Sequence, residues 1–269
     1  MKKNIILIFV VFVTIILVSC GHDEDVLRVG MDLSYPPFET VDLKNRPEGI
    51  SVDIAYELGK YLNKKVKIVN TKFDGLILAL QGGEIDVVIG SMSITEEREE
   101  VISFSKPYFY FKIISLLNKS FADNNNLKED STVEELLAIE NVRYIGIAGQ
   151  VSASIPTEYG KNVKNATDVS TAVAEIAQGT SDVLLMSGNP VADGYKANPT
   201  KTMILWDPFV SSPIAMAVKK GNDEFLEELN SFIDTFNDDG GMYDILIDKW
   251  DEVILEDLGK FGMSFYIDE

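Results

Sequence analysis

The chain of 269 residues contains one histidine, His22, and one cysteine, Cys20. A serine–histidine–aspartate triad needs a histidine beside its nucleophile, and a structural zinc site needs several cysteines or histidines. His22 stands in the polar stretch 21–25, which has the composition of a short flexible tether. These counts exclude histidine-based catalysis, a multi-histidine metal site and a disulfide within the chain. We therefore predict no catalytic residue, no metal site and no cofactor.

The single cysteine directly follows an apolar segment. Lys2 and Lys3 precede residues 5–18, which are apolar apart from Thr14. A membrane-spanning helix needs about 20 such residues, so this shorter run predicts a signal peptide over residues 1–19. The sequence Leu17-Val18-Ser19-Cys20 resembles the lipobox of bacterial lipoproteins, which implies cleavage before Cys20 and attachment of lipid, palmitate included, to its sulfur. The alternative is an ordinary signal peptide with a chance cysteine.

The mature chain is strongly acidic. Without Lys2 and Lys3, 22 basic residues stand against 43 acidic ones, a balance of −21. Because nucleic-acid binding needs a basic surface, nucleic acid is excluded as a partner. The same charge repels anionic lipid headgroups, so attachment to a membrane has to come from lipid on Cys20. We predict an extracytoplasmic monomer held at the cell membrane by that lipid, with residues 20–25 as its tether.

Arginine is the side chain best suited to bind a carboxylate ligand, because its planar fork matches both oxygens. The chain has four arginines, and Arg98 is the one that follows the helix-opening sequence Thr95-Glu96-Glu97. Free N–H groups at a helix start also favour an anion. Residue type alone leaves two roles open for Arg98: a carboxylate-binding group, or a surface ion pair with Glu96 or Glu99.

Strand-like and helix-like segments alternate along the chain, which predicts an α/β fold. Strands are expected at 26–30, 66–69, 85–89, 144–148 and 182–186, and helices at 51–62, 75–81, 133–139, 169–178, 223–239 and up to Trp250. Residues 121–130 are polar and are expected to form a loop. One pattern, a helix followed by glycine, aspartate and an apolar strand, occurs at 76–89 and again at 169–186. This repetition indicates two similar lobes.

Several motifs, in order, resemble bacterial extracellular solute-binding protein family 3, the polar amino-acid receptors of ABC importers. The resemblance covers roughly residues 26–250, and the motifs that carry it are Leu27-Arg28-Val29-Gly30-Met31-Asp32, Tyr35-Pro36-Pro37-Phe38, Phe73-Asp74-Gly75-Leu76, Ser93-Ile94-Thr95-Glu96-Glu97-Arg98, Phe104-Ser105-Lys106-Pro107-Tyr108 and Gly241-Met242-Tyr243-Asp244. No single motif is decisive, but their order is specific.

The resemblance implies a two-lobed, type II periplasmic-binding-protein-like fold with two hinge strands. Lobe 1 would comprise 26–113 and 208–269, and lobe 2 would comprise 114–207. The hinge strands would lie near 111–117 and 210–217. Residues beyond Trp250 extend past the family pattern, and no role is predicted for them.

The resemblance also implies a ligand site. In lobe 1, Arg98 and Ser93 would hold the ligand's carboxylate, and the side-chain pocket would come from Asp32, Tyr35 and Phe73. The implied site further includes Gly90, Ser91, Met92, Gln150, Val151, Ser152 and Ser187. Backbone N–H groups at Gln150–Ser152 would bind the second carboxylate oxygen, although the family often carries threonine at the position of Gln150. The alternatives are ordinary core for the two aromatic residues, a turn for Asp32 and a helix cap for Ser93.

Ser187 departs from the family pattern. At this position the family usually presents an acid for the ligand's ammonium group, and a hydroxyl is the weaker partner. Either a neighbour supplies the charge or the ligand is not a standard α-amino acid.

The function implied is capture of an amino acid, polar or basic, for the permease of an ABC importer. A dehydratase of the same fold and a ligand-sensing receptor are the alternatives. A dehydratase needs an acid or base over its ligand, and the sequence offers only Asp32 or Glu39 for that role.

Overall fold

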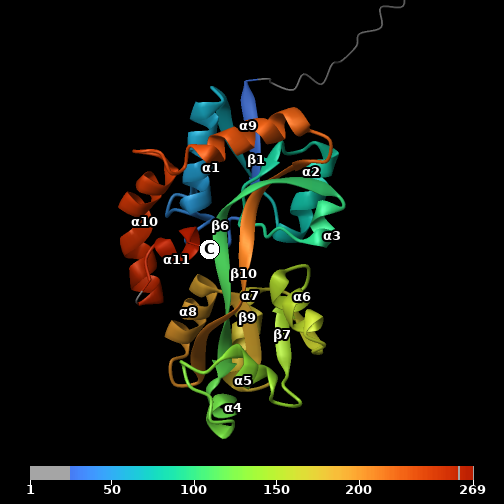
Figure 1. The fold of residues 1–269 in the computed structure, drawn as a ribbon, viewed down its shortest axis with the longest axis vertical. Helices are drawn as coiled ribbons and strands as arrows, with labels where there is room; N and C mark the ends of the chain where they lie inside the picture. Colours follow the sequence, from blue (N-terminus) through green and yellow to red (C-terminus); the bar gives the residue numbers. More distant parts are fainter. Residues whose placement is uncertain (1–24, 260, 269) are drawn as a thin grey trace, which may run out of the picture.

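The computed structural model describes residues 25–259 and 261–268, which form two α/β lobes arranged end to end (Figure 1). The predicted signal peptide, Cys20 and His22 lie outside the described residues. None of the helices within the described ranges is long and apolar enough to cross a membrane. The two-lobed α/β fold predicted from the sequence is confirmed.

The first lobe is built on the parallel strands β1 (Val26–Met31), β4 (Lys65–Asn70) and β5 (Val87–Val88). Its other elements are the short pair β2 (Thr40–Val41) and β3 (Pro47–Glu48), helix α1 (Ile50–Tyr61), the 3₁₀ turn η1 (Phe73–Gly75), α2 (Leu76–Gly82), α3 (Glu96–Glu99), α9 (Asp223–Asp234), α10 (Met242–Leu258) and α11 (Ser264–Ile267).

The second lobe repeats this plan with the parallel strands β7 (Tyr144–Ile147), β8 (Val163–Ala166) and β9 (Val183–Ser187). Its helices are α4 (Lys119–Asn124), α5 (Val133–Leu137), α6 (Val151–Glu158), α7 (Val169–Gln178) and α8 (Gly188–Ala197).

Two long antiparallel strands, β6 (Ile102–Asn118) and β10 (Thr202–Lys219), run through both lobes and join them. They sit at the centre of one eight-stranded sheet of order β4-β1-β5-β10-β6-β9-β7-β8. The pairing shifts register between Leu205 and Val210. The predicted lobe boundaries, 113/114 and 207/208, both fall inside these strands.

The pattern repeated in the sequence has the same structural basis in each lobe. Helices α2 and α7 each end at a glycine with a left-handed backbone, Gly83 (φ 74°) and Gly179 (φ 73°), a conformation that costs glycine little. The aspartate that follows binds an arginine at the neighbouring strand. Asp86 accepts from the backbone and side chain of Arg28, and Asp182 accepts in the same way from Arg143.

Three expectations about single elements are wrong, and one helix was missed. The polar stretch 121–130 is partly helical, since α4 extends to Asn124, and the helix expected over 223–239 ends at Asp234. The helix expected to end at Trp250 continues to Leu258, because Ile254 and Leu258 keep its apolar face buried. Helix α8, which follows Ser187 directly, was not expected.

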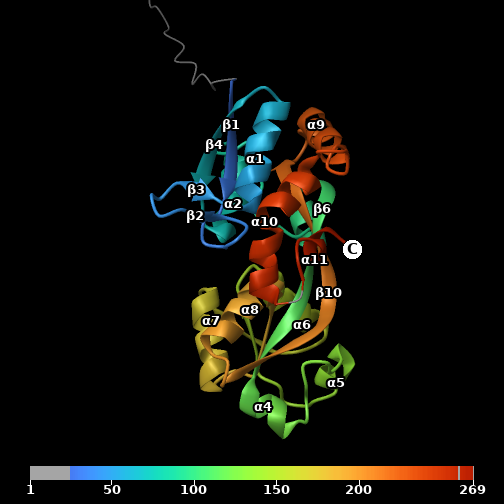
Figure 2. The same ribbon diagram turned by 90° about the vertical axis from the view of Figure 1, so that its left-hand side faces the viewer.

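The chain's last described turn packs between the lobes, where α10 and α11 lie beside α8 (Figure 2). The ring of Tyr266 contacts Phe38 and Phe111, with centroids 5.0 and 5.1 Å away. Its hydroxyl donates to the side chain of Asn189 in α8 and accepts from the backbone N–H of the same residue at 3.2 Å. Residues after Trp250 therefore contact both lobes.

Candidate functional site

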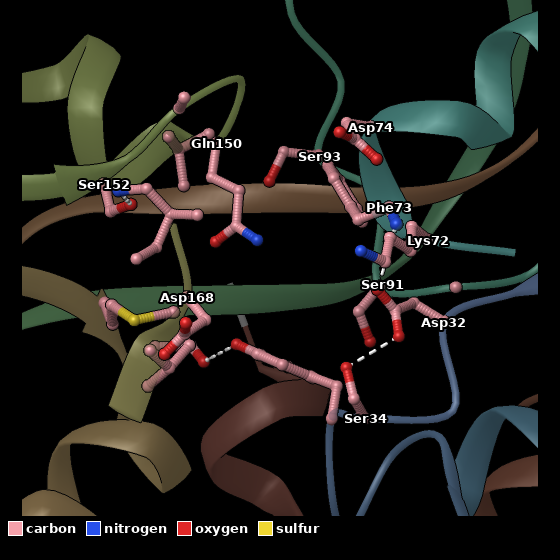
Figure 3. Close-up of a pocket in the computed structure, with 18 of the residues that line it drawn as sticks. Asp32, Ser34, Lys72, Phe73, Asp74, Ser91, Ser93, Gln150, Ser152 and Asp168 are labelled. Carbon is pink, nitrogen blue, oxygen red and sulfur yellow. Dashed lines mark hydrogen bonds between the residues drawn. The ribbon is translucent and has the colours of Figure 1, made fainter. Parts of the chain in front are cut away.

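A cavity of about 920 Å³ lies between the lobes, and residues of both lobes line it. Every residue predicted for the ligand site except Met92 is at its wall, namely Asp32, Tyr35, Phe73, Gly90, Ser91, Ser93 and Arg98 from the first lobe and Gln150, Val151, Ser152 and Ser187 from the second. Figure 3 shows Asp32, Phe73, Ser91, Ser93, Gln150 and Ser152 among them. The Met92 side chain is fully buried in a core cluster with Leu76 and Leu80, so the structure does not bring it to the cavity.

Arg98 is buried, with 8% of its surface exposed. Its guanidinium donates to the backbone oxygens of Ser93 (2.8 Å) and Gly149 (3.0 Å), and it lies over the ring of Phe73, 5.2 Å from the centroid. No carboxylate of the described residues lies within ion-pair distance of it. Burial lowers the pKa of Arg98 from its ordinary value. The surface ion pair with Glu96 or Glu99 is therefore wrong.

The start of α3 does not provide the free backbone N–H groups for an anion that the sequence indicated. This helix has only four residues, and the backbone N–H of Arg98 donates to the Thr95 hydroxyl at 3.3 Å. The group that can bind an anion here is therefore the side chain of Arg98 and not the start of α3. Ser93 is not a helix cap, and its hydroxyl accepts from Ser212 at 2.8 Å.

Asp32 fixes the loop that carries Phe73. One carboxylate oxygen accepts from the Ser34 hydroxyl (2.6 Å) and the other from the backbone N–H of Phe73 (2.9 Å). A carboxylate oxygen can accept more than one hydrogen bond, so both stay able to accept from a ligand donor. Asp32 thus combines the turn role with a place at the cavity wall.

Tyr35 and Ser187 meet across the cleft, where their hydroxyl oxygens lie 2.6 Å apart. Ser187 is buried (2% exposed) and is the residue before α8. Burial raises the pKa of Tyr35 well above its ordinary value, so this pair is neutral at physiological pH. Together with the bond from Arg98 to Gly149, it connects the two lobes across the cavity.

The turn before α6 supplies the second lobe's backbone groups. The N–H of Gln150 donates to Ile147, so it is occupied, and the Ser152 hydroxyl accepts from the N–H of Ile147 at 2.9 Å. The first N–H groups of a helix have no acceptor within it. Val151 and Ser152, the first residues of α6, are therefore the donors that this turn can present.

Residues 27–252 match the family of bacterial extracellular solute-binding proteins, family 3. The chain belongs to this family. A probable histidine-binding protein of Neisseria gonorrhoeae is 27% identical over 229 residues, covering 84% of this chain and 82% of the relative. The resemblance inferred from the motifs is thereby confirmed.

Two of the solved structures that resemble this solute-binding protein, each with 31% sequence identity, illustrate the similarity. One is the ancestral amino acid-binding protein AncCDT-1, a precursor of cyclohexadienyl dehydratase, with a TM-score of 0.70 and coverage of 84% of this chain and 95% of that one. The other is an ancestral arginine-binding protein bound to glutamine, with a TM-score of 0.69 and coverage of 84% and 98%.

Sequence reasoning missed other residues of the solute-binding cavity. Asn70, Lys72, Asp74, Asn165, Thr167 and Asp168 are also at the wall, and Phe111, Ile113, Ile147 and Met186 add apolar area. Most of these residues follow directly after strands or lie at their ends. The position of these residues at the end of a strand was the signal in the sequence that could have found them, since ligands in α/β folds bind at the ends of strands.

Glu39 is the most unusual of the cavity residues that the sequence did not assign to the ligand site. Its side chain is buried (1% exposed), and one oxygen, Oε1, accepts from the hydroxyls of Ser51 (2.6 Å) and Ser91 (2.8 Å). Burial raises the pKa of Glu39 to about 8, the two serines oppose this rise, and the charge of Asp32 adds to it. At neutral pH the carboxyl group is therefore mostly protonated.

We expect Glu39→Gln to stabilise the ligand-free protein increasingly as pH rises. Between pH 4.5 and about 8 the unfolded chain releases the Glu39 proton while the folded chain keeps it, so wild-type stability falls with pH. The upper limit is about 5 kcal/mol, from about 1.4 kcal/mol per pKa unit. Urea unfolding of both proteins at pH 5, 7 and 8.5 should give a difference that grows and then levels off above pH 8. Parallel stability profiles would show that Glu39 does not titrate in this way.

Proposed function

We propose that this protein captures an amino acid between its lobes and delivers it to an ABC-type importer. The observation that supports this most is Arg98, a buried guanidinium at the cavity wall with no carboxylate partner among the described residues. A buried cation without a counterion is costly, and a ligand carboxylate would offset that cost. Val151 and Ser152 would add backbone donors from the opposite lobe.

We infer that the ligand's side chain carries a hydrogen-bond donor at its end. Asp32 only accepts hydrogen bonds, and Phe73 and Tyr35 offer ring surface beside it. Basic and amide amino acids fit this pocket, whereas glutamate and aspartate would place a carboxylate against Asp32. The related ancestral protein was solved with glutamine and, in another structure, with arginine.

Calorimetric titration with the twenty standard amino acids tests this proposal, together with mass spectrometry of any ligand retained on purification. A basic or amide amino acid is the expected tightest binder. An acidic or purely aliphatic amino acid as the tightest binder would overturn the ligand class. No binding of any amino acid would overturn the receptor function.

Asp32→Asn should separate the two kinds of ligand. A cationic side chain loses a charge partner, worth about 1.5–3 kcal/mol, so L-arginine affinity should fall at least tenfold. L-Glutamine, which loses no charge pair, should lose about threefold at most. The asparagine amide can still donate to Ser34 and accept from Phe73, so the loop is expected to keep its position. Equal losses for both ligands would show that Asp32 acts only through the loop.

Ligand binding alone accounts for the residues of the site, and no chemical reaction is needed to explain them. The related protein AncCDT-1 is an amino acid-binding protein and a precursor of an enzyme, so the same fold serves both purposes. For a receptor, ligand incubated with the protein should be recovered chemically unchanged. Conversion of a bound amino acid or of a cyclic precursor, followed by mass spectrometry, would establish the enzyme alternative instead.

We also propose that the chain is a lipoprotein held outside the cytoplasm by lipid on Cys20. The lipobox-like sequence 17–20 supports this, and it lies outside the described residues. Cys20→Ser should move the protein from the membrane fraction to the soluble fraction, while the ligand affinity of the purified protein stays the same. An unchanged membrane fraction would contradict the anchor.

A further inference from the structure

Among the described residues, Glu39 is the one acid at the cavity wall that is buried; Asp32 is half-buried, and Asp74 and Asp168 are exposed. Both hydrogen bonds found for its carboxyl group end on Oε1. Oε2 makes no hydrogen bond with the described residues, and Glu39 lines the cavity. One of the two donors, Ser91, has a left-handed backbone (φ 51°), which is uncommon for a residue other than glycine.

Among the described residues, no cation forms a hydrogen bond or an ion pair with Glu39. The titratable groups that interact with it electrostatically are Asp32, Tyr35 and Tyr108, and none of them is positively charged. The Tyr108 hydroxyl is itself buried without a hydrogen-bond partner among the described residues. A buried carboxylate needs a positive partner, so the chemical group that would complete this corner of the cavity is a cation that donates hydrogen bonds.

Glu39 acts on the same end of the cavity as Ser187. Its charge contributes to the raised pKa of Tyr35, and the Tyr35 hydroxyl lies 2.6 Å from Ser187 Oγ. Ser187 occupies the position where the family usually carries an acid, and its own hydroxyl is engaged by Tyr35. An acid is therefore present at this end of the cavity, but the first lobe supplies it.

We propose that Glu39 binds the α-ammonium group of the amino-acid ligand through Oε2, in place of an acid at position 187. This rests on the proposed function, because it requires an amino acid in the cavity. An ammonium group favours the ionised carboxylate, so binding releases the Glu39 proton to the solvent. Affinity for an α-amino acid accordingly rises with pH up to about 8, where the free carboxyl group titrates.

Calorimetry on the intact mature protein tests this with two matched ligand pairs. The pairs are L-arginine with its deaminated analogue 5-guanidinopentanoate, and L-glutamine with its deaminated analogue glutaramate. Glu39→Gln should weaken binding of the amino acid at least tenfold and change binding of the deaminated analogue less than threefold. At pH 7, titration in two buffers of different ionisation enthalpy should show proton release on binding to the wild type and none on binding to the variant.

Glu48→Gln is the matched control, since Glu48 is an exposed acid of the same lobe outside the cavity. It should leave affinity and proton release unchanged. Equal losses for both members of a pair, or the same proton release from wild type and Glu39→Gln, would overturn the role of Glu39. If wild type binds neither L-arginine nor L-glutamine, the ligand class fails, and the Glu39 assignment fails with it.

Discussion

Replacing Arg98 by alanine is expected to weaken amino-acid binding at least tenfold and leave the protein folded. Loss of one charge-assisted partner costs about 1.5–3 kcal/mol. Arg98 donates to the carbonyl groups of Ser93, which lines the cavity, and of Gly149, which is exposed, so water can satisfy both carbonyl groups in the variant. Titration calorimetry measures the affinity, and thermal unfolding of the ligand-free variant checks the fold.

Arg46→Ala is the control for this experiment. Arg46 is a largely exposed arginine of the same lobe, paired with Asp42 and outside the cavity, so its removal should not affect affinity. Arg98→Lys should recover only part of the binding, because an ammonium group cannot reproduce the planar fork. Wild-type affinity in Arg98→Ala, at an unchanged melting temperature, would contradict carboxylate binding by Arg98.

Tyr266→Ala is expected to cause the largest loss of stability among the variants discussed. Removing a fully buried aromatic side chain costs about 3–5 kcal/mol. The change also removes the hydroxyl that pairs with Asn189, a residue with no exposed surface. For a chain of this length the melting temperature should fall by roughly 10 °C. Calorimetric or circular-dichroism melting curves measure this.

Two further variants separate the contributions of the ring and the hydroxyl. Tyr266→Phe keeps the ring and leaves the backbone N–H and the side-chain Oδ1 of Asn189 without this partner, which should cost about 1–3 kcal/mol. Tyr56→Ala, at an exposed tyrosine of α1, should have little effect. A Tyr266→Ala protein that melts within about 2 °C of wild type would show that the C-terminal turn does not stabilise the lobes.

The lobes were predictable because their signal is local and repeated. Glycine, aspartate and an apolar strand lie within a few residues of each other, and both copies fold into the same kind of turn, in which the aspartate binds an arginine. Helix α8 gave no such signal, since Gly188 and Pro190 in its first turn usually indicate a loop. The packing of its buried residues against the rest of the protein outweighs that local preference.

The ligand site was predictable as a set of positions but not as a set of contacts. The motif around Ser93 placed the right loop at the cavity, but neighbouring side chains in an extended loop point in opposite directions, and Met92 enters the core. Glu39 lines the cavity although the sequence analysis did not assign it to the ligand site. Its partners Ser51 and Ser91 are 12 and 52 residues away, so neither its burial nor its raised pKa has a local signal.

The contact between Tyr266 and Asn189 bears on how fast ligand is exchanged. Asn189 lies two residues after Ser187, in the second lobe, and Lys112 of strand β6 holds the same C-terminal turn by donating to the backbone oxygens of Phe265 and Asp268. Separation of the lobes has to move α8 away from Tyr266, and this movement costs free energy. Each cost of about 1.4 kcal/mol reduces the population of the open form about tenfold. Ligand enters and leaves only when the lobes are open, so the contact between Tyr266 and Asn189 slows both the entry and the release of ligand. Both the capture of ligand and its release are therefore slower than they would be without this contact.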